Sequence, residues 1–353
     1  MNTGWPTETQ RLLLHAALDR TAGAITAFEQ WRQYVDLEGH IELGMLRLLP
    51  QVHANLRAQA FDDPLMGRLA GIHRYHWVEM RRLLHKAAGG IRLLTDAGIP
   101  VMLSKGIVVA TEYHPSYALR PMSDVDLTIP CDRVDEAFSL LEHADWRQQV
   151  RYPSGVQLKH IVALKHGCGF INETGEQIDL HWRPVPEFGS ARAIRRIWAS
   201  AVQTRIEEIE LLRCSTTHLL LLTLLHGIRP NPVAPIRWVS DALTILRSDA
   251  ENVDWEELIA FAAEERVLMR IASAIEYLVR EFGLSVQPSV LQRLRFHRPG
   301  VLERVESKLY DAPGGAGFWA GKLIRVFSDD RVHQLPSALA GAARILSHKK
   351  LRR

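Results

Sequence analysis

Three carboxylates in strand-like segments are the side chains of this chain best suited to chemistry. Asp124 and Asp126 lie within residues 120–129, which read RPMSDVDLTI, and Asp179 lies in the later segment IDLHW. Because successive side chains of a strand alternate between its two faces, Asp124 and Asp126 should point the same way while the apolar residues between them enter a core. Such hard oxygen ligands suit Mg²⁺ or Mn²⁺ bound together with a substrate triphosphate.

A Ser-Lys-Gly turn upstream adds groups that suit phosphate. Ser104, Lys105 and Gly106 follow a short apolar run and should open a helix, where free backbone N–H groups can bind phosphate oxygens. The Lys105 ammonium is a compact cation that could neutralise the β- and γ-phosphates. An exposed lysine with no such role is the alternative.

Three further polar residues border the carboxylates. The Arg120 guanidinium could donate hydrogen bonds to a phosphate oxygen or to Asp124. The Ser123 hydroxyl could hydrogen-bond a phosphate or a nearby backbone group. His181 shares a strand face with Asp179. It could bind the nucleotide, shuttle a proton, or simply support that carboxylate.

The C-terminal helices carry polar groups within apolar patterns. Arg237 and Asp241 are spaced to pair on one helix face, and an ordinary ion pair is the favoured interpretation. The alternative is that these helices supply the pocket for a second substrate that accepts a transferred group. In that case His226, Arg237 and Asp241 would face the metal ions held by the carboxylates.

The elements that must position these residues indicate an α+β fold. Apolar spacings of three and four predict helices over residues 8–97, and residues 100–103 should form the first strand. A helix over 106–113 and a strand over 124–129 should follow, and then a helix from residue 131. The fold class is therefore a small mixed sheet flanked by N-terminal and C-terminal helical regions.

Further strands are predicted over residues 156–164, 169–172, 177–182 and 204–211. The turn residues at 172–175 should join the second and third of these as an antiparallel hairpin. Helices are expected again beyond residue 215. These patterns suggest three parts, namely an N-terminal helical region (1–97), an α/β core (98–212) and a C-terminal helical domain (213–353).

Composition narrows the class of protein. Lys and Arg number 43 against 40 Asp and Glu, a net charge of +3 that predicts no large nucleic-acid footprint. The basic tail, residues 348–353, is expected to be a solvated helix end. Three separated cysteines indicate neither a disulfide framework nor a thiolate zinc site, and no apolar run reaches the roughly 20 residues that cross a bilayer. We expect a cytoplasmic protein without a membrane segment.

The K-G, R-x-x-x-D-x-D and D-L-H-W segments together resemble the nucleotidyltransferase superfamily with the polymerase-beta-like fold, specifically a poorly characterised bacterial branch. The likeness spans residues 97–182 and extends into the helices after 215. Familiar members place Gly-Ser where this chain has Ser104-Lys105-Gly106.

The resemblance implies transfer of a nucleoside monophosphate from an NTP to a hydroxyl-bearing acceptor, with release of pyrophosphate by a two-metal mechanism. Asp124 and Asp126 would hold both ions, and Asp179 would complete the ligand shell of the second metal and help deprotonate the acceptor hydroxyl. Ser104, Lys105, Gly106, Arg120, Ser123 and His181 would bind the nucleotide. The near-neutral charge favours a small-molecule acceptor over RNA or protein.

Two alternatives stay open on the sequence alone. The first is a degenerate nucleotide-binding or interaction module that keeps the fold without turnover. The second is an Asp-x-Asp glycosyltransferase, which is disfavoured because a nucleotide-binding α/β half should precede the motif and the first ninety or so residues look helical.

Overall fold

The computed structural model describes residues 4–150, 157–229, 236–311, 320–321 and 324–325. Its chain divides into two compact units, each built from separate stretches. The helical unit comprises the described residues within 1–82, 108–122 and 216–318, and the sheet unit comprises the described residues within 83–107, 123–215 and 319–353. The α+β class is confirmed, whereas the three-part division of the chain stays a prediction. The basic tail, residues 348–353, lies outside the described residues.

The helical unit is organised around a helix that is buried on nearly every side. In α10 (Thr216–Gly227) every residue except His226 is buried, in keeping with a sequence rich in leucine. The described residues contain no helix long and apolar enough to cross a membrane. The other helices wholly within this unit are α1 (Glu8–Leu18), α2 (Gly23–Trp31), α3 (Leu43–Leu46), α4 (Leu49–Ala58), α11 (Arg237–Asp249), α12 (Trp255–Glu264), α13 (Leu268–Phe282), α14 (Pro288–Arg295) and α15 (Val301–Asp311).

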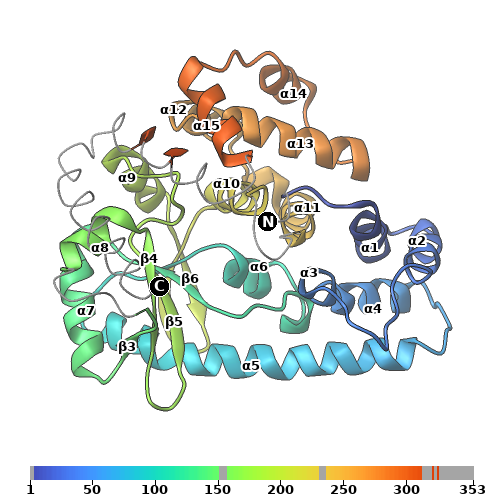
Figure 1. Ribbon diagram of the computed structural model, residues 1–353, viewed down its shortest axis with the longest axis horizontal. Coiled ribbons are helices and arrows are strands. Elements are labelled where there is room, and N and C mark those ends of the chain that lie inside the picture. Colours follow the sequence, from blue (N-terminus) through green and yellow to red (C-terminus); the bar gives the residue numbers. More distant parts are fainter. Residues whose placement is uncertain (1–3, 151–156, 230–235, 312–319, 322–323, 326–353) are drawn as a thin grey trace, which may run out of the picture. The chain divides into compact units, whose positions relative to one another are not determined.

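Two helices contribute residues to both units. The 31-residue helix α5 (Met66–Asp96) is drawn as the long helix in Figure 1, and α6 (Gly106–Glu112) is short. The helices α7 (Val134–His143), α8 (Leu158–Leu164) and α9 (Ala191–Ala199) lie wholly within the sheet unit.

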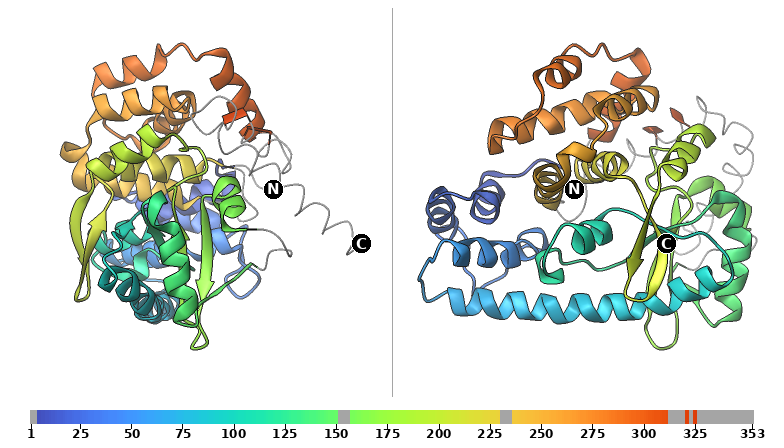
Figure 2. Two further views of the ribbon diagram at one scale, coloured as in Figure 1. Left: turned by 90° about the vertical axis from the view of Figure 1, so that its left-hand side faces the viewer. Right: turned by 180° about the vertical axis from the view of Figure 1, so that it is seen from behind.

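Among the described residues, seven strands form one mixed sheet in the order β3-β4-β5-β2-β1-β7-β6 (Figures 1 and 2). The pairs β2–β5 and β1–β7 are parallel and the others are antiparallel. The predicted hairpin between β4 and β5 is confirmed. The strands are β1 (Met102–Leu103), β2 (Asp126–Thr128), β3 (Arg147–Gln148), β4 (Gly167–Ile171), β5 (Gln177–His181), β6 (Val202–Ile206) and β7 (Ile209–Arg213).

Apolar side chains cover the central strands of the sheet unit. Phe138 of α7 contacts Phe170 of β4 edge-on, with ring centroids 4.9 Å apart, and lies 6.1 Å from the Trp182 ring. Trp182 is fully buried and donates from Nε1 to two backbone carbonyls, so it belongs to the core. This packing holds β4 and β5 in place beneath the candidate site.

The strand predicted over residues 156–164 is wrong for its described part, which forms helix α8. The apolar and β-branched residues of that run suit a buried strand or a buried helix equally well. A capping box decides in favour of helix, because the backbone N–H of Gln157 donates to the His160 side chain and the Gln157 side chain caps the first turn. Histidine at the third helical position is outside the usual Glu or Gln signature.

The single strand predicted over residues 204–211 is also wrong, because the chain turns back at its centre. β6 and β7 form a hairpin whose two-residue turn is Glu207-Glu208. Glu207 has φ of +52°, a left-handed conformation that usually calls for glycine or asparagine. Two glutamates gave no turn signal in the sequence.

Candidate active site

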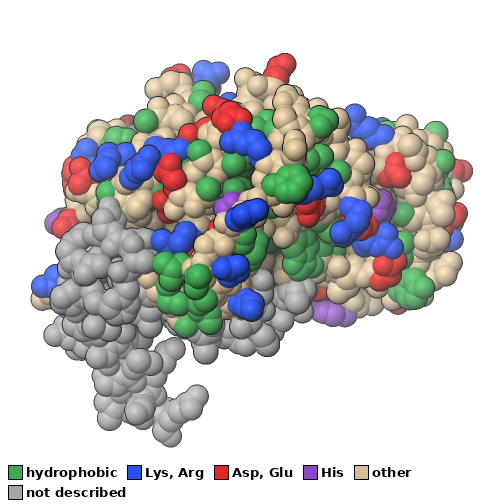
Figure 3. Space-filling view, turned by 90° about the horizontal axis from the view of Figure 1, so that it is seen from above, with side chains coloured by type: hydrophobic (Ala, Val, Ile, Leu, Met, Phe, Trp, Pro, Cys, Tyr) green, Lys and Arg blue, Asp and Glu red, His purple; other side chains and the backbone are tan. Residues whose placement is uncertain are grey.

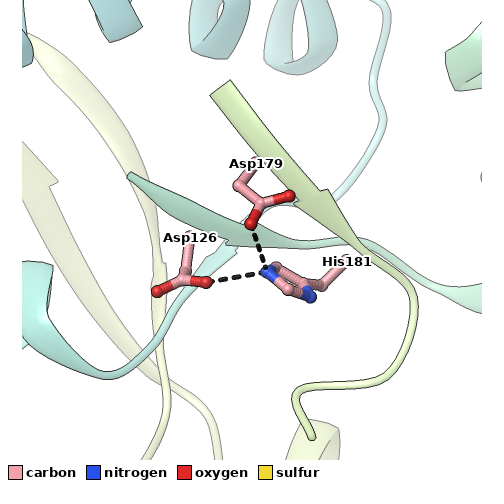
Figure 4. A group of neighbouring side chains, drawn as sticks. All are labelled: Asp126, Asp179 and His181. Carbon is pink, nitrogen blue, oxygen red and sulfur yellow. Dashed lines mark hydrogen bonds and ion pairs between the residues drawn. The ribbon is translucent and has the colours of Figure 1, made fainter. Parts of the chain in front are cut away.

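Two carboxylates lie side by side on neighbouring parallel strands. Strand register pairs Asp126 of β2 with Asp179 of β5 and pairs Thr128 with His181. Figure 4 shows the side chains of Asp126, Asp179 and His181 converging on one face of the sheet. The sequence could place each aspartate on a strand, and the pairing of β2 with β5 brings the two together.

The predicted alternation of buried apolar and partly exposed polar side chains along strand β2 is confirmed around Asp126. Val125, Leu127 and Ile129 have no exposed surface, while the Asp126 side chain between them retains 18%. On β5, Leu180 is buried between Asp179 and His181 in the same way. A shift of one residue in either strand would turn its carboxylate into the core, so the apolar face fixes the register of the site.

Lys105 and His181 both contact a single oxygen of Asp126. The Lys105 Nζ atom and the His181 Nε2 atom each lie 2.7 Å from Asp126 Oδ1. His181 Nε2 is also 3.4 Å from Asp179 Oδ2. These side chains are 9% (Lys105), 4% (His181) and 33% (Asp179) exposed, so Asp179 faces solvent most. The cluster therefore has a buried cationic side and a solvent-facing carboxylate.

The backbone at Lys105 adopts a left-handed conformation. Its φ is +59°, which costs a side-chain-bearing residue about 1 kcal/mol or more. The residue joins β1 to α6, and β1 lies next to β2 in the sheet. This turn carries the ammonium to Asp126. Since α6 has only seven residues, the Lys105 side chain is the main source of positive charge at this turn.

Burial and charge act in opposite directions on the protonation of the cluster. Burial alone would raise the pKa of Asp126, but the Lys105 charge and the His181 hydrogen bond outweigh it and hold the pKa well below its usual value. Burial and the Lys105 charge lower the pKa of His181, and its hydrogen bonds to Asp126 and Asp179 more than compensate, so the pKa is raised. Because Asp126 is ionised and can only accept, His181 Nε2 carries the proton and donates it.

A glycine in the neighbouring strand makes room for the His181 ring. Gly167 of β4 lies opposite His181, and a Cβ atom placed on it would lie 2.4 Å from His181 Nδ1. That nitrogen is buried without a hydrogen-bond partner in the described residues. Sequence reasoning missed Gly167. The signal available was the Gly-Cys-Gly run within the strand, since a strand glycine often marks a close approach.

The two carboxylates that converge here beside His181 fit a divalent cation. Ligand atoms of Asp126, Asp179 and His181 all lie within 4.8 Å of one another. The carboxylate oxygens suit Mg²⁺ or Mn²⁺. The ammonium on Asp126 Oδ1 shows that this position already stabilises a positive charge. Asp126 and Asp179 are accordingly the residues that could hold the ion.

Asp124 lies outside this group of three. Strand β2 begins at Asp126, shorter than predicted, so Asp124 is exposed on the preceding loop with Ser123, whose Oγ is 3.5 Å from Asp124 Oδ1. Ser104 is fully buried and its Oγ has no hydrogen-bond partner in the described part of the chain, and Gly106 begins α6.

The remaining predicted residues belong to the helical unit. Arg120 donates from Nε and Nη2 to the two oxygens of Asp241, at 2.6 and 2.7 Å, and both side chains are buried. Arg237 donates to the carbonyl of Pro121, and His226 Nδ1 lies 2.7 Å from Arg229 Nη2. Asp241 is thus paired through both of its oxygens with Arg120, which precedes β2 in the chain. An acceptor pocket built from His226, Arg237 and Asp241 stays a prediction.

Comparison with known proteins agrees with this geometry. A family described as uncharacterised nucleotidyltransferase matches residues 44–283, which include all four clustered side chains. No match was found to a curated protein or to a solved structure. With about two thirds of its length matched, the chain belongs to this uncharacterised nucleotidyltransferase family.

Proposed function

We propose that this protein moves a nucleoside monophosphate from an NTP to a hydroxyl-bearing acceptor, with Mg²⁺ or Mn²⁺ held by Asp126 and Asp179. The in-register pair of carboxylates on parallel strands is the observation that carries the proposal. Family membership supports the reaction class and leaves the Asp-x-Asp glycosyltransferase without support. Asp124, exposed just before β2, would share a second ion in a two-metal arrangement.

The residues of this chain would then have distinct tasks. When bound, the ions would neutralise the triphosphate and make the acceptor hydroxyl more acidic. Asp179, the most solvent-facing member of the cluster, would accept the hydroxyl proton. The acceptor oxygen forms a bond to the α-phosphorus, and the bond to the bridging oxygen breaks, so that pyrophosphate leaves with that electron pair. Lys105 would neutralise charge on the leaving group, and His181 would hold Asp126 in position.

Charge distribution bears on the acceptor. On the face drawn in Figure 3, Lys and Arg side chains are interspersed with Asp and Glu, in keeping with a net charge of +3. A long track for nucleic acid would require a larger excess of one sign. We therefore propose a small acceptor molecule in preference to an extended RNA or a protein.

A nucleotide-binding module without turnover is the second candidate. The ion pair between Lys105 and Asp126 favours it, because the ammonium neutralises this carboxylate without a metal. The two candidates differ in one product, since only the transferase releases pyrophosphate.

Pyrophosphate release tests the proposal. The protein would be incubated with each NTP, Mg²⁺ or Mn²⁺ and a panel of hydroxyl-bearing small molecules. We expect acceptor-dependent release that falls by about 10²-fold or more in Asp126→Asn, because the substitution removes a charge that acts in the transition state. Asp135→Asn, the same change at an exposed position of α7, should leave the rate unchanged. Nucleotide binding without release would support the second candidate.

A further inference from the structure

Helices α4 and α5 border an open cavity within the helical unit. Its volume is about 590 Å³, and it is lined by His53 and Arg57 of α4, His73 and Arg74 of α5, and three alanines. No carboxylate is among these lining residues. The cavity thus brings two guanidinium groups and two imidazoles to one place, with small side chains leaving room between them.

Helical spacing explains why these side chains converge. His53 and Arg57 are four residues apart on α4, and His73 and Arg74 follow Ala70 on α5 at three and four residues, so each set shares one helix face. The rings of His53 and His73 meet with centroids 5.3 Å apart, at an angle of 62°. Arg57 and Arg74 remain exposed at the edge, where they are accessible to a ligand.

His53 is the buried polar group of this cavity. It is only 8% exposed, and its Nδ1 has no hydrogen-bond partner among the described residues. Burial lowers the pKa of His53, and the charges of His73, Arg57 and Arg74 lower it further. The positive potential of the neighbouring groups therefore reaches the buried ring, and an anion among them would relieve it.

We propose that this cavity binds the phosphate group of a phosphate ester of about nucleotide size. Arginine pairs phosphate oxygens through two parallel N–H bonds, and the His53 ring offers a further polar contact at the buried end. A volume of about 590 Å³ exceeds what a lone phosphate needs and falls in the range of small-molecule sites.

An aromatic side chain lies one turn further along the face of α5 that carries His73 and Arg74. Trp77 lies four residues after His73 and three after Arg74, and it is 48% exposed. An exposed tryptophan one turn from a phosphate contact is placed to stack on a base. The site therefore favours a nucleotide, whether a free molecule or the end of an RNA chain.

Binding measured without metal or NTP tests this site separately from the transferase. Inorganic phosphate, AMP and a short single-stranded RNA would be titrated into the full chain by calorimetry. We expect AMP or the RNA to bind more tightly than phosphate, and Arg57→Gln/Arg74→Gln to weaken the binding at least tenfold. Arg82→Gln is the matched control, since Arg82 is an exposed α5 arginine that pairs with Glu79.

The outcomes separate the two sources of the ligand. Binding of AMP that depends on Arg57 and Arg74 indicates a free nucleotide, and binding of RNA alone with the same dependence indicates a nucleic-acid end. Equal affinity in the double variant and in Arg82→Gln, or no binding of any probe, overturns the proposal. The Asp126→Asn variant should bind these probes as the wild type does, so failure of the transferase hypothesis would not affect this result.

Discussion

At the scale of single residues, Lys105 has two competing roles that can be measured separately. Its ammonium forms an ion pair with Oδ1 of Asp126, and the same carboxylate is proposed to bind a metal ion. Lys105→Gln should therefore strengthen binding of Mn²⁺ alone, by about tenfold, because a competing cation is lost. The same variant should weaken NTP binding, since a positive charge beside the phosphates is removed. Electron paramagnetic resonance titration of Mn²⁺ with and without NTP measures both.

Lys159→Gln is the control for this test, because Lys159 is an exposed lysine of α8 in the same unit. A change of the same sign in both affinities for Lys105→Gln would contradict the role given to the ammonium.

Gly167 is the second residue whose identity the site requires. Gly167→Ala would place a methyl group against the buried His181 ring, and such overpacking costs about 1–3 kcal/mol. We expect the ring to shift from Asp126 and activity to fall about tenfold. Gly169→Ala is the matched variant on the same strand face, because the atoms nearest to its methyl group would be those of the exposed Gln149 side chain. Pyrophosphate release and thermal unfolding of both variants check this; equal activities would contradict it.

At the scale of elements, α5 depends on a glycine where it packs against the sheet unit. A Cβ atom on Gly90 would lie 3.0 Å from Trp146 and 3.1 Å from Ile178, both buried. Gly90→Leu should lower the free energy of unfolding by about 1–3 kcal/mol through overpacking. A Cβ atom on Gly71 of the same helix would have no atom within 4 Å, so Gly71→Leu should raise the free energy of unfolding by about 1 kcal/mol through helix propensity. Urea denaturation measures both, and destabilisation by Gly71→Leu comparable to that by Gly90→Leu would refute the packing argument.

The spacing of apolar residues predicted correctly those helices and strands whose sequence fits only one of the two structures. The alternation at Val125, Leu127 and Ile129 gave β2 its buried face, and α10 is a helix in the region beyond residue 215 where helices were expected. The same spacing gave wrong predictions where the apolar pattern fits two structures and local geometry decides between them. The capping box of α8 and the turn at Glu207 are the two cases.

The candidate site was predictable residue by residue but not as a constellation. Asp126, Asp179, His181 and Lys105 could each be named from the sequence. That Asp126 lies opposite Asp179 depends on the pairing of β2 with β5, which are separated by about fifty residues of chain. Likewise, the Arg120–Asp241 pair joins positions 121 residues apart, beyond the reach of any local pattern.

At the scale of the whole molecule, buried histidines set the response of stability to acid. Burial lowers the pKa of His76 and of His114 to about 4, from 6.5. A lowered histidine pKa means that the unfolded chain binds more protons, so stability falls as pH drops from 6.5 toward 4. His181, with its raised pKa, acts oppositely and loses its contribution as pH rises above 6.5. Asp126 contributes above pH 3.8, and its contribution is lost only as pH falls below that value.

We expect His76 alone to cost about 2 kcal/mol of stability between pH 7.5 and pH 5. His76→Gln removes this titration, so the difference between its unfolding free energies at the two pH values should be smaller than that of the wild type by about this amount. Chemical denaturation at both pH values provides the measurement. An undiminished acid loss in the variant would show that His76 is not the responsible group.

The ion-dependence of NTP binding tests the central claim most directly. A non-hydrolysable NTP would be titrated into the wild type, Asp126→Asn and Asp135→Asn, each with and without Mn²⁺. The carboxylate pair predicts tight binding only with the ion, retained in Asp135→Asn and lost in Asp126→Asn. Equal NTP affinity with and without Mn²⁺, or an unchanged affinity in Asp126→Asn, would contradict the assignment of Asp126 and Asp179 as the metal site of a nucleotidyltransferase.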